Sequence, residues 1–369
     1  MGEKIIDIGS VAVKGGSLCE RASALLLEGK LEEAANLISV GRWLNPVSAD
    51  LANLDGLACL RRGDCDDAVE RFTEAMMMDE DRADLRNNLG TALLEAGRIR
   101  EAADALAGGL AIDGDNVNLL RNAAAAAITL GDIDRALELA RRALEQDPYE
   151  AASHVVLAET LLRGGESHLA AEALGRIRFL DDVPLKVLLK AVHIYIRMDM
   201  MEEAEAVVRR TLESDPDDGR LMQLLGKVLE LRGDLDAARR VYTRILSFDS
   251  SNVEALNSLG CILEQAGIYG EALVHFREAH RLSPSCEQIE VNLGIVLDKL
   301  DMDDAASEHL SRVIERAPHF GVAFNAMGCF LSRRGRYEEA ASMFSAAIEL
   351  EPDNERYLRN LALAREMTG

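Results

Sequence analysis

LNSLGCILEQAGIYGEALVHFREAHRLSP, the stretch from Leu256 to Pro284, carries two apolar patterns with the period of an α-helix. In its first half Leu256, Leu259 and Leu263 are three or four residues apart, and the same spacing returns after Gly267. Apolar residues spaced in this way share one face of a helix. A glycine between the two patterns suits the left-handed backbone of a tight turn. The stretch therefore predicts two short helices that turn back on each other.

The same pattern recurs along the chain with a period of 34 residues. FNAMGCFLSRRGRYEEAASMFSAAIELEP, from Phe324 to Pro352, repeats it two periods later. Six prolines are also separated by multiples of 34, namely Pro46, Pro148, Pro216, Pro284, Pro318 and Pro352. Periodicity of this length is typical of helical repeat architectures. It divides the chain into ten units: 15–48, 49–82, 83–116, 117–150, 151–184, 185–218, 219–252, 253–286, 287–320 and 321–354.

Three positions of the unit hold small or turn-forming residues. The fifteenth is Gly in eight of the ten units and Asp in the other two, at Asp199 and Asp301, which suits a turn between two helices. The eighth is Gly or Ala in nine units, with Val192 as the exception, and the twentieth is Ala in all ten. Small side chains let two helices approach closely. We therefore expect the eighth and twentieth residues to meet where the two helices of a unit pack together.

The two quoted stretches resemble the tetratricopeptide-repeat family, and the pattern covers residues 15–354 without insertion or deletion. The resemblance implies an all-α fold, a right-handed superhelical solenoid of antiparallel helix pairs. Residues 355–369 are expected to form one further first helix that caps the array. Residues 1–14 show no repeat, and both disorder and packing on the first unit remain open. The resemblance also implies a role in binding other proteins.

The composition limits the classes of partner. The 369 residues include 41 Lys and Arg against 64 Asp and Glu, which gives a formal net charge of −23. So acidic a chain lacks the basic surface that binding to nucleic-acid phosphates or to an anionic membrane requires. We therefore predict neither a nucleic-acid nor a membrane partner. With no signal peptide or membrane-spanning run evident, a cytoplasmic location is the default expectation.

No motif for catalysis or for cofactor or metal binding is present in the sequence. It contains no phosphate-binding GxxxxGK[ST] loop, no GxGxxG after a strand, and neither HExxH nor GxSxG. The six cysteines form no CxxC pair, and the seven histidines do not pair at the spacing of metal ligands. We therefore predict that the chain is not an enzyme and that it holds no cofactor and no metal.

In the family, the first helix of each unit lines the concave face of the solenoid, which places its second, fifth, sixth, ninth, twelfth and thirteenth residues there. Asparagine is frequent at these positions although it is a poor helix former. Its amide both donates and accepts hydrogen bonds, so it suits the backbone of a bound segment, whereas capping or solvation is the alternative. These asparagines are Asn53, Asn87, Asn88, Asn118, Asn122, Asn257, Asn292, Asn325 and Asn360.

Basic side chains gather at the same positions in units six and seven. Residues 185–252 hold eleven Lys and Arg against twelve Asp and Glu, so this part of an acidic chain is nearly neutral. A basic stripe would hold an acidic segment through charge-assisted hydrogen bonds. A solvated face, or salt bridges with neighbouring acids, is the alternative. The predicted groove residues are Lys186, Lys190, His193, Arg197, Arg220 and Lys227.

The leading functional hypothesis is an interaction scaffold or adaptor that binds a protein or peptide segment, favouring an acidic one, in the concave groove. Two other functions remain open. One is a regulatory sensor whose solenoid changes shape when an effector binds. The other is a structural protein that self-assembles into homo-oligomers.

Overall fold

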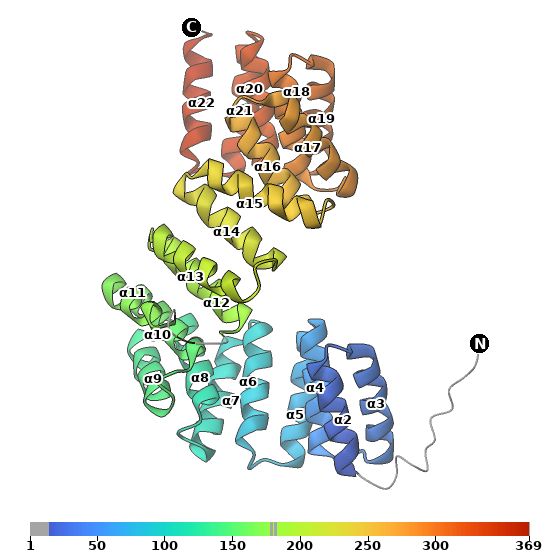
Figure 1. The fold of residues 1–369 in the computed structure, drawn as a ribbon, viewed down its shortest axis with the longest axis vertical. Helices are drawn as coiled ribbons and strands as arrows, with labels where there is room; N and C mark the ends of the chain where they lie inside the picture. The colour runs from blue at the N-terminus through green and yellow to red at the C-terminus, as the bar shows by residue number, and fades with distance from the viewer. Residues whose placement is uncertain (1–14, 178–179, 181–182, 369) are drawn as a thin grey trace, which may run out of the picture. The chain divides into compact units, whose positions relative to one another are not determined.

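The structure, a computed structural model, describes residues 15–177, 180 and 183–368, and residues 1–14 lie outside this range. The described residues form 21 α-helices and no strand, an all-α helical repeat solenoid as the sequence predicts (Figure 1). The first helices of the ten units are α2 (Gly15–Leu27), α4 (Ala49–Arg62), α6 (Ala83–Glu95), α8 (Val117–Leu130), α10 (Ala151–Arg163), α12 (Leu185–Arg197), α14 (Gly219–Arg232), α16 (Val253–Gln265), α18 (Glu287–Lys299) and α20 (Gly321–Arg333). The second helices are α3 (Leu31–Leu44), α5 (Cys65–Met78), α7 (Ile99–Ile112), α9 (Ile133–Gln146), α11 (Ser167–Gly175), α13 (Met201–Ser214), α15 (Leu235–Phe248), α17 (Tyr269–Leu282), α19 (Asp303–Arg316) and α21 (Tyr337–Leu350), and α22 (Glu355–Glu366) follows them.

The turn inside each unit has a left-handed residue at its fifteenth position, which confirms the turn predicted from glycine. At Gly63 φ is 88°, and no atom lies within 4 Å of the place that a Cβ would take. The backbone conformation, rather than a lack of space, therefore calls for glycine there. Asp199 and Asp301 adopt φ of 59° and 55° at the same position. Aspartate tolerates this conformation better than most side chains.

The eighth residue of a unit packs against the twenty-fourth residue, which lies on the second helix. A Cβ on Gly226 would lie 2.6 Å from Cζ of Tyr242, and one on Gly328 would lie 2.5 Å from Cε1 of Phe344. The twentieth residue is fully buried in all ten units, and in the ninth unit a Cβ on Gly294 would also lie 3.5 Å from the carbonyl oxygen of the twentieth residue, Ala306. A Cα–Cβ bond in a helix tilts toward the N-terminus, so a large side chain one turn further along the second helix covers the glycine.

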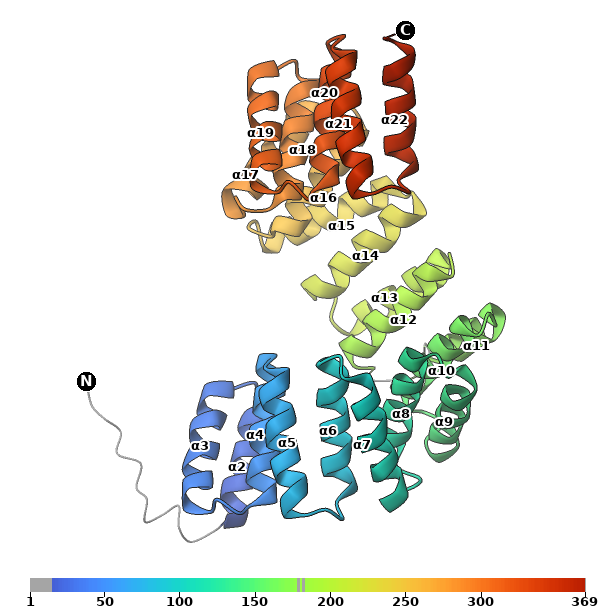
Figure 2. The same ribbon diagram turned by 180° about the vertical axis from the view of Figure 1, so that it is seen from behind.

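Consecutive helices from α2 to α11, and again from α13 to α22, pack against one another around small cores. In one of these, Leu106 of α7, Leu119 of α8 and Leu139 of α9 are buried together. Figure 2 shows the two helices of a repeat side by side in the pairs α18 with α19 and α20 with α21, seen from behind. One second helix departs from the common length, because α11 has 9 residues whereas α9 has 14. The fifth unit therefore has a shorter second helix than the fourth.

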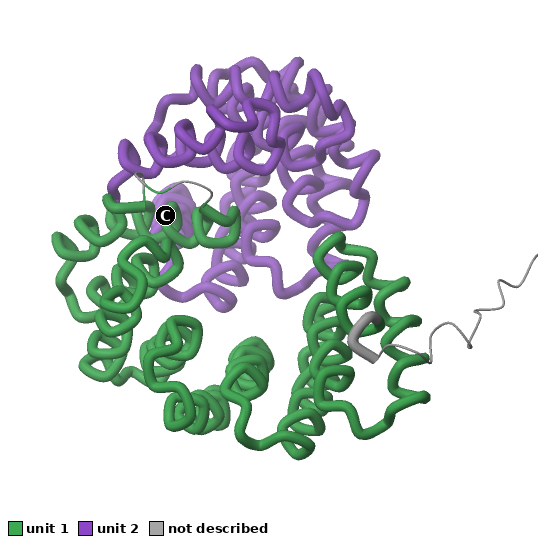
Figure 3. Tube along the Cα trace, turned by 60° about the horizontal axis from the view of Figure 1, so that its bottom comes forward, with its two compact units in different colours: residues 1–198 green, residues 199–369 purple. Residues whose placement is uncertain are grey.

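The helices form two compact units, the first ending at Met198 and the second beginning at Asp199 (Figure 3). The division falls within the sixth repeat, between α12 and α13. This repeat is also where the sequence pattern departs most, at Val192 and Asp199. Helices α2 to α12 thus belong to one compact unit and α13 to α22 to the other.

Candidate protein-binding site

Eight of the nine asparagines predicted for the first-helix face hydrogen-bond to one another in pairs. In each pair the sixth residue of one first helix donates to the fifth residue of the preceding first helix, 35 residues earlier. Asn122 Nδ2, for example, lies 2.9 Å from Oδ1 of Asn87. The other pairs are Asn88 with Asn53 at 2.8 Å, Asn292 with Asn257 at 2.9 Å and Asn360 with Asn325 at 2.8 Å. The asparagines therefore link successive repeats.

The two asparagines of a pair have different roles, because one donates the hydrogen bond and the other accepts it. The donor Asn122 also directs its Nδ2 to Oγ1 of Thr91 at 3.1 Å, so both of its N–H groups are spent on the preceding helix. The acceptor Asn87 has no partner for its own Nδ2 within the described part of the chain. Partly exposed acceptor amides such as Asn87 therefore keep a donor available to a bound backbone, whereas the acceptor Asn325 is buried. Their use in binding a partner remains a prediction.

Four of the predicted basic residues lie along one exposed face of α12. Lys186, Lys190, His193 and Arg197 are exposed, whereas Leu188 on the same helix is buried. Lys186 Nζ lies 3.4 Å from Glu95 Oε1, and Arg197 Nη1 lies 2.9 Å from Glu159 Oε1. Among residues 15–177, 180 and 183–368, Lys190 and His193 form no ion pair. The face therefore holds cations that are partly free to meet an incoming anion.

Glu159 of α10 forms ion pairs with two neighbouring arginines. Its Oε1 lies 2.9 Å from Arg197 Nη1 and 3.2 Å from Arg163 Nε. Burial acts to raise the pKa of Glu159, but the hydrogen bonds from the two arginines outweigh it, so its pKa lies below the ordinary value. Arg197 is thus engaged within the first-helix face, as the salt-bridge alternative anticipated.

The remaining two predicted cations lie on α14, in the second compact unit. Arg220 and Lys227 are both exposed. Lys227 Nζ lies 3.3 Å from Glu230 Oε2 on the same helix, whereas no described residue forms an ion pair with Arg220. The six predicted basic residues thus fall into two groups, one in each compact unit.

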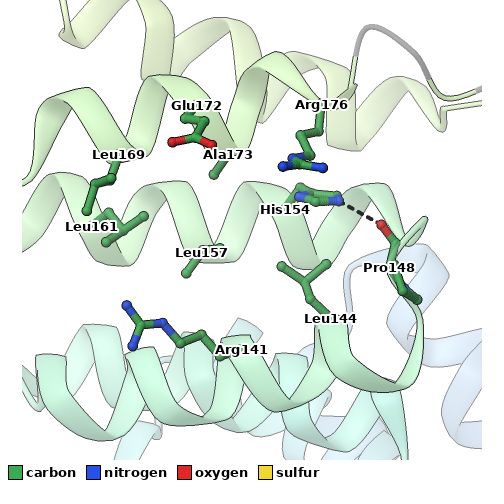
Figure 4. A pocket seen from close by; sticks show the side chains of 10 residues that line it. All are labelled: Arg141, Leu144, Pro148, His154, Leu157, Leu161, Leu169, Glu172, Ala173 and Arg176. Carbon is green, nitrogen blue, oxygen red and sulfur yellow. Dashed lines mark hydrogen bonds between the residues drawn. The ribbon is translucent and has the colours of Figure 1, made fainter.

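A pocket of about 360 Å³ lies in the first compact unit between α9, α10 and α11 (Figure 4). Its walls are mainly aliphatic, and Arg141 and Arg176 enter it from opposite sides. His154 borders it and donates from Nε2 to the carbonyl oxygen of Pro148 at 2.9 Å, while its buried Nδ1 has no hydrogen-bond partner among the residues that the structure describes. The aliphatic walls suit an apolar side chain of a bound partner, and the two arginines suit a carboxylate of that partner next to it. The aliphatic lining residues are Leu144, Leu157, Leu161 and Leu169.

These pocket residues were not predicted from the sequence, although one signal was present there. The fourth residue of the repeat is apolar in seven of the ten units, whereas Arg86, His154 and Glu290 occupy it in the others. Two of these side chains reach the backbone carbonyl six residues earlier, Arg86 to Glu80 and His154 to Pro148. A polar residue at the usually apolar fourth position therefore marks a repeat whose local structure differs from that of its neighbours.

Comparison with protein families agrees with this architecture. One tetratricopeptide repeat model matches residues 60–127, and a second matches residues 121–181, 189–253 and 325–369. Together the matches extend over more than half of the chain. The chain belongs to the tetratricopeptide repeat family.

Each of two curated relatives matches only part of this chain, and the matched segment is an even smaller share of the relative's own length. Tetratricopeptide repeat protein 7B of Homo sapiens is 29% identical over 130 residues, which are 35% of this chain and 15% of the relative. The BBSome complex member BBS4 of Bos taurus is 29% identical over 174 residues, 46% of this chain and 32% of the relative. The matched part thus spans a third or less of these two relatives.

A solved structure, that of the APC/C hetero-tetramer Cut9-Hcn1, has a chain that aligns with 95% of this chain and 83% of its own length, at 14% identity and a TM-score of 0.47. None of the helices in the described residues combines the length and apolar character needed to cross a membrane.

Proposed function

We propose that this chain is a non-catalytic interaction scaffold that holds an acidic segment of a partner protein against the exposed face of α12. The observation that carries the proposal is the row of four basic side chains on that face, in a chain of net charge −23. Cations gathered on one face raise the encounter rate with an anionic segment and lower the free energy of a bound carboxylate.

The amides of two earlier first helices, α4 and α6, support an extended partner. Asn53 and Asn87 accept hydrogen bonds from the next repeat, and no described residue accepts one from their Nδ2 groups. Donors on two successive first helices suit a backbone that runs across both of them. One relative, BBS4, is by its name a member of a complex, and the tetratricopeptide repeat architecture offers this chain the same kind of role.

The test is fluorescence anisotropy with a labelled Glu-rich peptide on the full chain at low and at moderate salt. We expect the double variant Lys186→Glu, Lys190→Glu to bind about tenfold more weakly at low salt, with a smaller difference at moderate salt. The charge reversal replaces attraction by repulsion at the face that the peptide would occupy.

The matched control is Arg239→Glu, Arg240→Glu on α15. Arg239 lies 3.5 Å from Asp236 and Arg240 is exposed, so each double variant removes one weakly paired and one unpaired cation. The control is expected to bind the peptide nearly as tightly as the wild type. Equal weakening in both double variants, or no binding of the acidic peptide by the wild type, would show that the α12 face is not the site.

A further inference from the structure

Glu290 of α18 is a fully buried carboxylate at the fourth position of the ninth repeat. Leu120, Leu188 and Leu256, at the same position of other repeats, are buried and apolar. A carboxylate costs much more to bury than leucine unless charged or hydrogen-bonding groups surround it. The neighbours of Glu290 therefore need explanation.

Two histidines and two arginines surround this carboxylate. His309 Nδ1 lies 3.3 Å and Arg312 Nη1 lies 3.0 Å from Glu290 Oε1. Arg316 Nη2 lies 3.0 Å from Oε2, an ion pair without hydrogen-bond geometry. The ring of His280 packs edge-on against that of His309, with 5.7 Å between the ring centroids. The site thus draws side chains from α17, α18 and α19.

We propose that His280, Glu290 and His309 form a binding site for a divalent transition-metal ion such as Zn²⁺. One nitrogen of each imidazole and one carboxylate oxygen lie within 4.8 Å of one another. Two imidazoles and one carboxylate form a ligand set that zinc uses in proteins, with the fourth position left to water. Small side-chain rotations would bring the three ligands to zinc distances of about 2.0–2.2 Å.

An unsatisfied nitrogen supports the site independently of the carboxylate. Nδ1 of His280 is buried and has no hydrogen-bond partner among the described residues. A buried polar atom without a partner loses its hydration and gains nothing in exchange. A metal ion bound to an imidazole nitrogen supplies that missing interaction, and the other nitrogen then takes the role of donor.

The two arginines do not close the site to a cation. Arg312 already forms an ion pair with Glu308, and Arg316 lies 3.9 Å from Glu287. Both guanidinium groups remain partly exposed, at 43% and 37% of their side-chain surface. Each can therefore keep a carboxylate partner while a metal ion takes its place at Glu290. The three carboxylates outnumber the two arginines, so an added divalent ion leaves the cluster with little net charge.

The ligand types also select the class of metal. Imidazole favours zinc and its transition-metal neighbours, whereas Mg²⁺ and Ca²⁺ prefer oxygen ligands only. His280 belongs to the eighth repeat, and Glu290 and His309 belong to the ninth. A bound ion would therefore tie two adjacent repeats together, and Zn²⁺ should stabilise the folded chain in proportion to its binding.

The experiment is a calorimetric titration of the full chain, free of any polyhistidine tag, with ZnCl₂ and separately with MgCl₂, together with the visible absorption of bound Co²⁺. We expect one Zn²⁺ site, Co²⁺ bands of a site containing nitrogen ligands, and no binding of Mg²⁺ at this site. The variants His280→Ala, His309→Ala and Glu290→Gln should each weaken Zn²⁺ binding by at least about tenfold. Circular dichroism checks that each variant is folded.

The matched controls are His275→Ala on α17 and His319→Ala after α19, which remove histidines from the same two repeats but outside the cluster. Both should bind Zn²⁺ as the wild type does. Absence of Zn²⁺ binding in the wild type overturns the proposal. So does undiminished binding in His280→Ala and His309→Ala, or a loss of binding in the two controls that equals the loss in the cluster variants.

Discussion

Gly260 and Phe276 pack directly against each other within the eighth repeat, where a Cβ on Gly260 would lie 2.6 Å from Cε1 of Phe276. Both residues are buried, and in a close-packed interior the ring can make room for an added methyl group only by shifting its neighbours. We expect Gly260→Ala to lower the free energy of unfolding by about 1–3 kcal/mol, measured by urea denaturation. Combining it with Phe276→Leu should recover part of this loss. Additive effects of the two changes would contradict the direct contact.

The Asn122–Asn87 pair should contribute measurably to stability. Asn122→Ala removes the hydrogen bonds to Asn87 and Thr91, and we expect a loss of about 1 kcal/mol in the free energy of unfolding. Asn118 is the control, because it is exposed on the same helix and no described residue hydrogen-bonds to its side chain. Asn118→Ala should leave the urea midpoint nearly unchanged. If the two variants unfold alike, the pairing contributes nothing to stability.

The stability that Glu159 provides should depend on pH. Its pKa in the folded chain lies below the ordinary value despite its burial, because Arg197 and Arg163 hydrogen-bond to the charged form. The contribution is therefore fully present above the unfolded pKa of about 4.3 and is lost as pH falls through the folded pKa. We expect Glu159→Gln to be about 1 kcal/mol less stable than the wild type at neutral pH. The two urea curves should converge as the pH falls below the depressed folded pKa of Glu159, and a constant difference would exclude this role.

The left-handed turn residue Asp199 offers a test of backbone strain. Its φ is 59°, a conformation that alanine tolerates less well than aspartate and glycine tolerates best. We expect Asp199→Ala to lower the free energy of unfolding by about 1 kcal/mol and Asp199→Gly to leave it unchanged or to raise it slightly. The melting temperatures of the three proteins give the order. An alanine variant as stable as the glycine variant would show that this conformation carries no strain.

Residues that act within one repeat could be predicted from the sequence. The glycines of the turns, the ten buried alanines and the helix pairs all follow from local backbone preference and from apolar spacing. The exact partner of the eighth residue did not follow, because the tilt of side chains along the second helix decides which turn covers it. The early end of α11 at Gly175 is likewise absent from the pattern.

Contacts between repeats were harder to foresee. The sequence shows asparagines at the fifth and sixth positions, but only the offset between successive first helices reveals that they meet 35 residues apart. The cluster around Glu290 could not be predicted from the spacing of ligand residues in the sequence, because its three side chains come from three different helices. The clustering of cations on α12 was visible in the sequence, whereas the engagement of Arg197 by Glu159 required the packing of α10 beside α12.

The third repeat, residues 83–116, contains both members of the asparagine linkage, an acceptor in Asn87 and a donor in Asn88. If this segment were duplicated in tandem, Asn88 of the second copy would therefore lie opposite Asn87 of the first copy and could donate a hydrogen bond to it. The array could grow at this point by in-frame gene duplication without leaving an amide unmatched at the new junction. Engineers who wish to lengthen the chain would find in residues 83–116 a module that is compatible with itself.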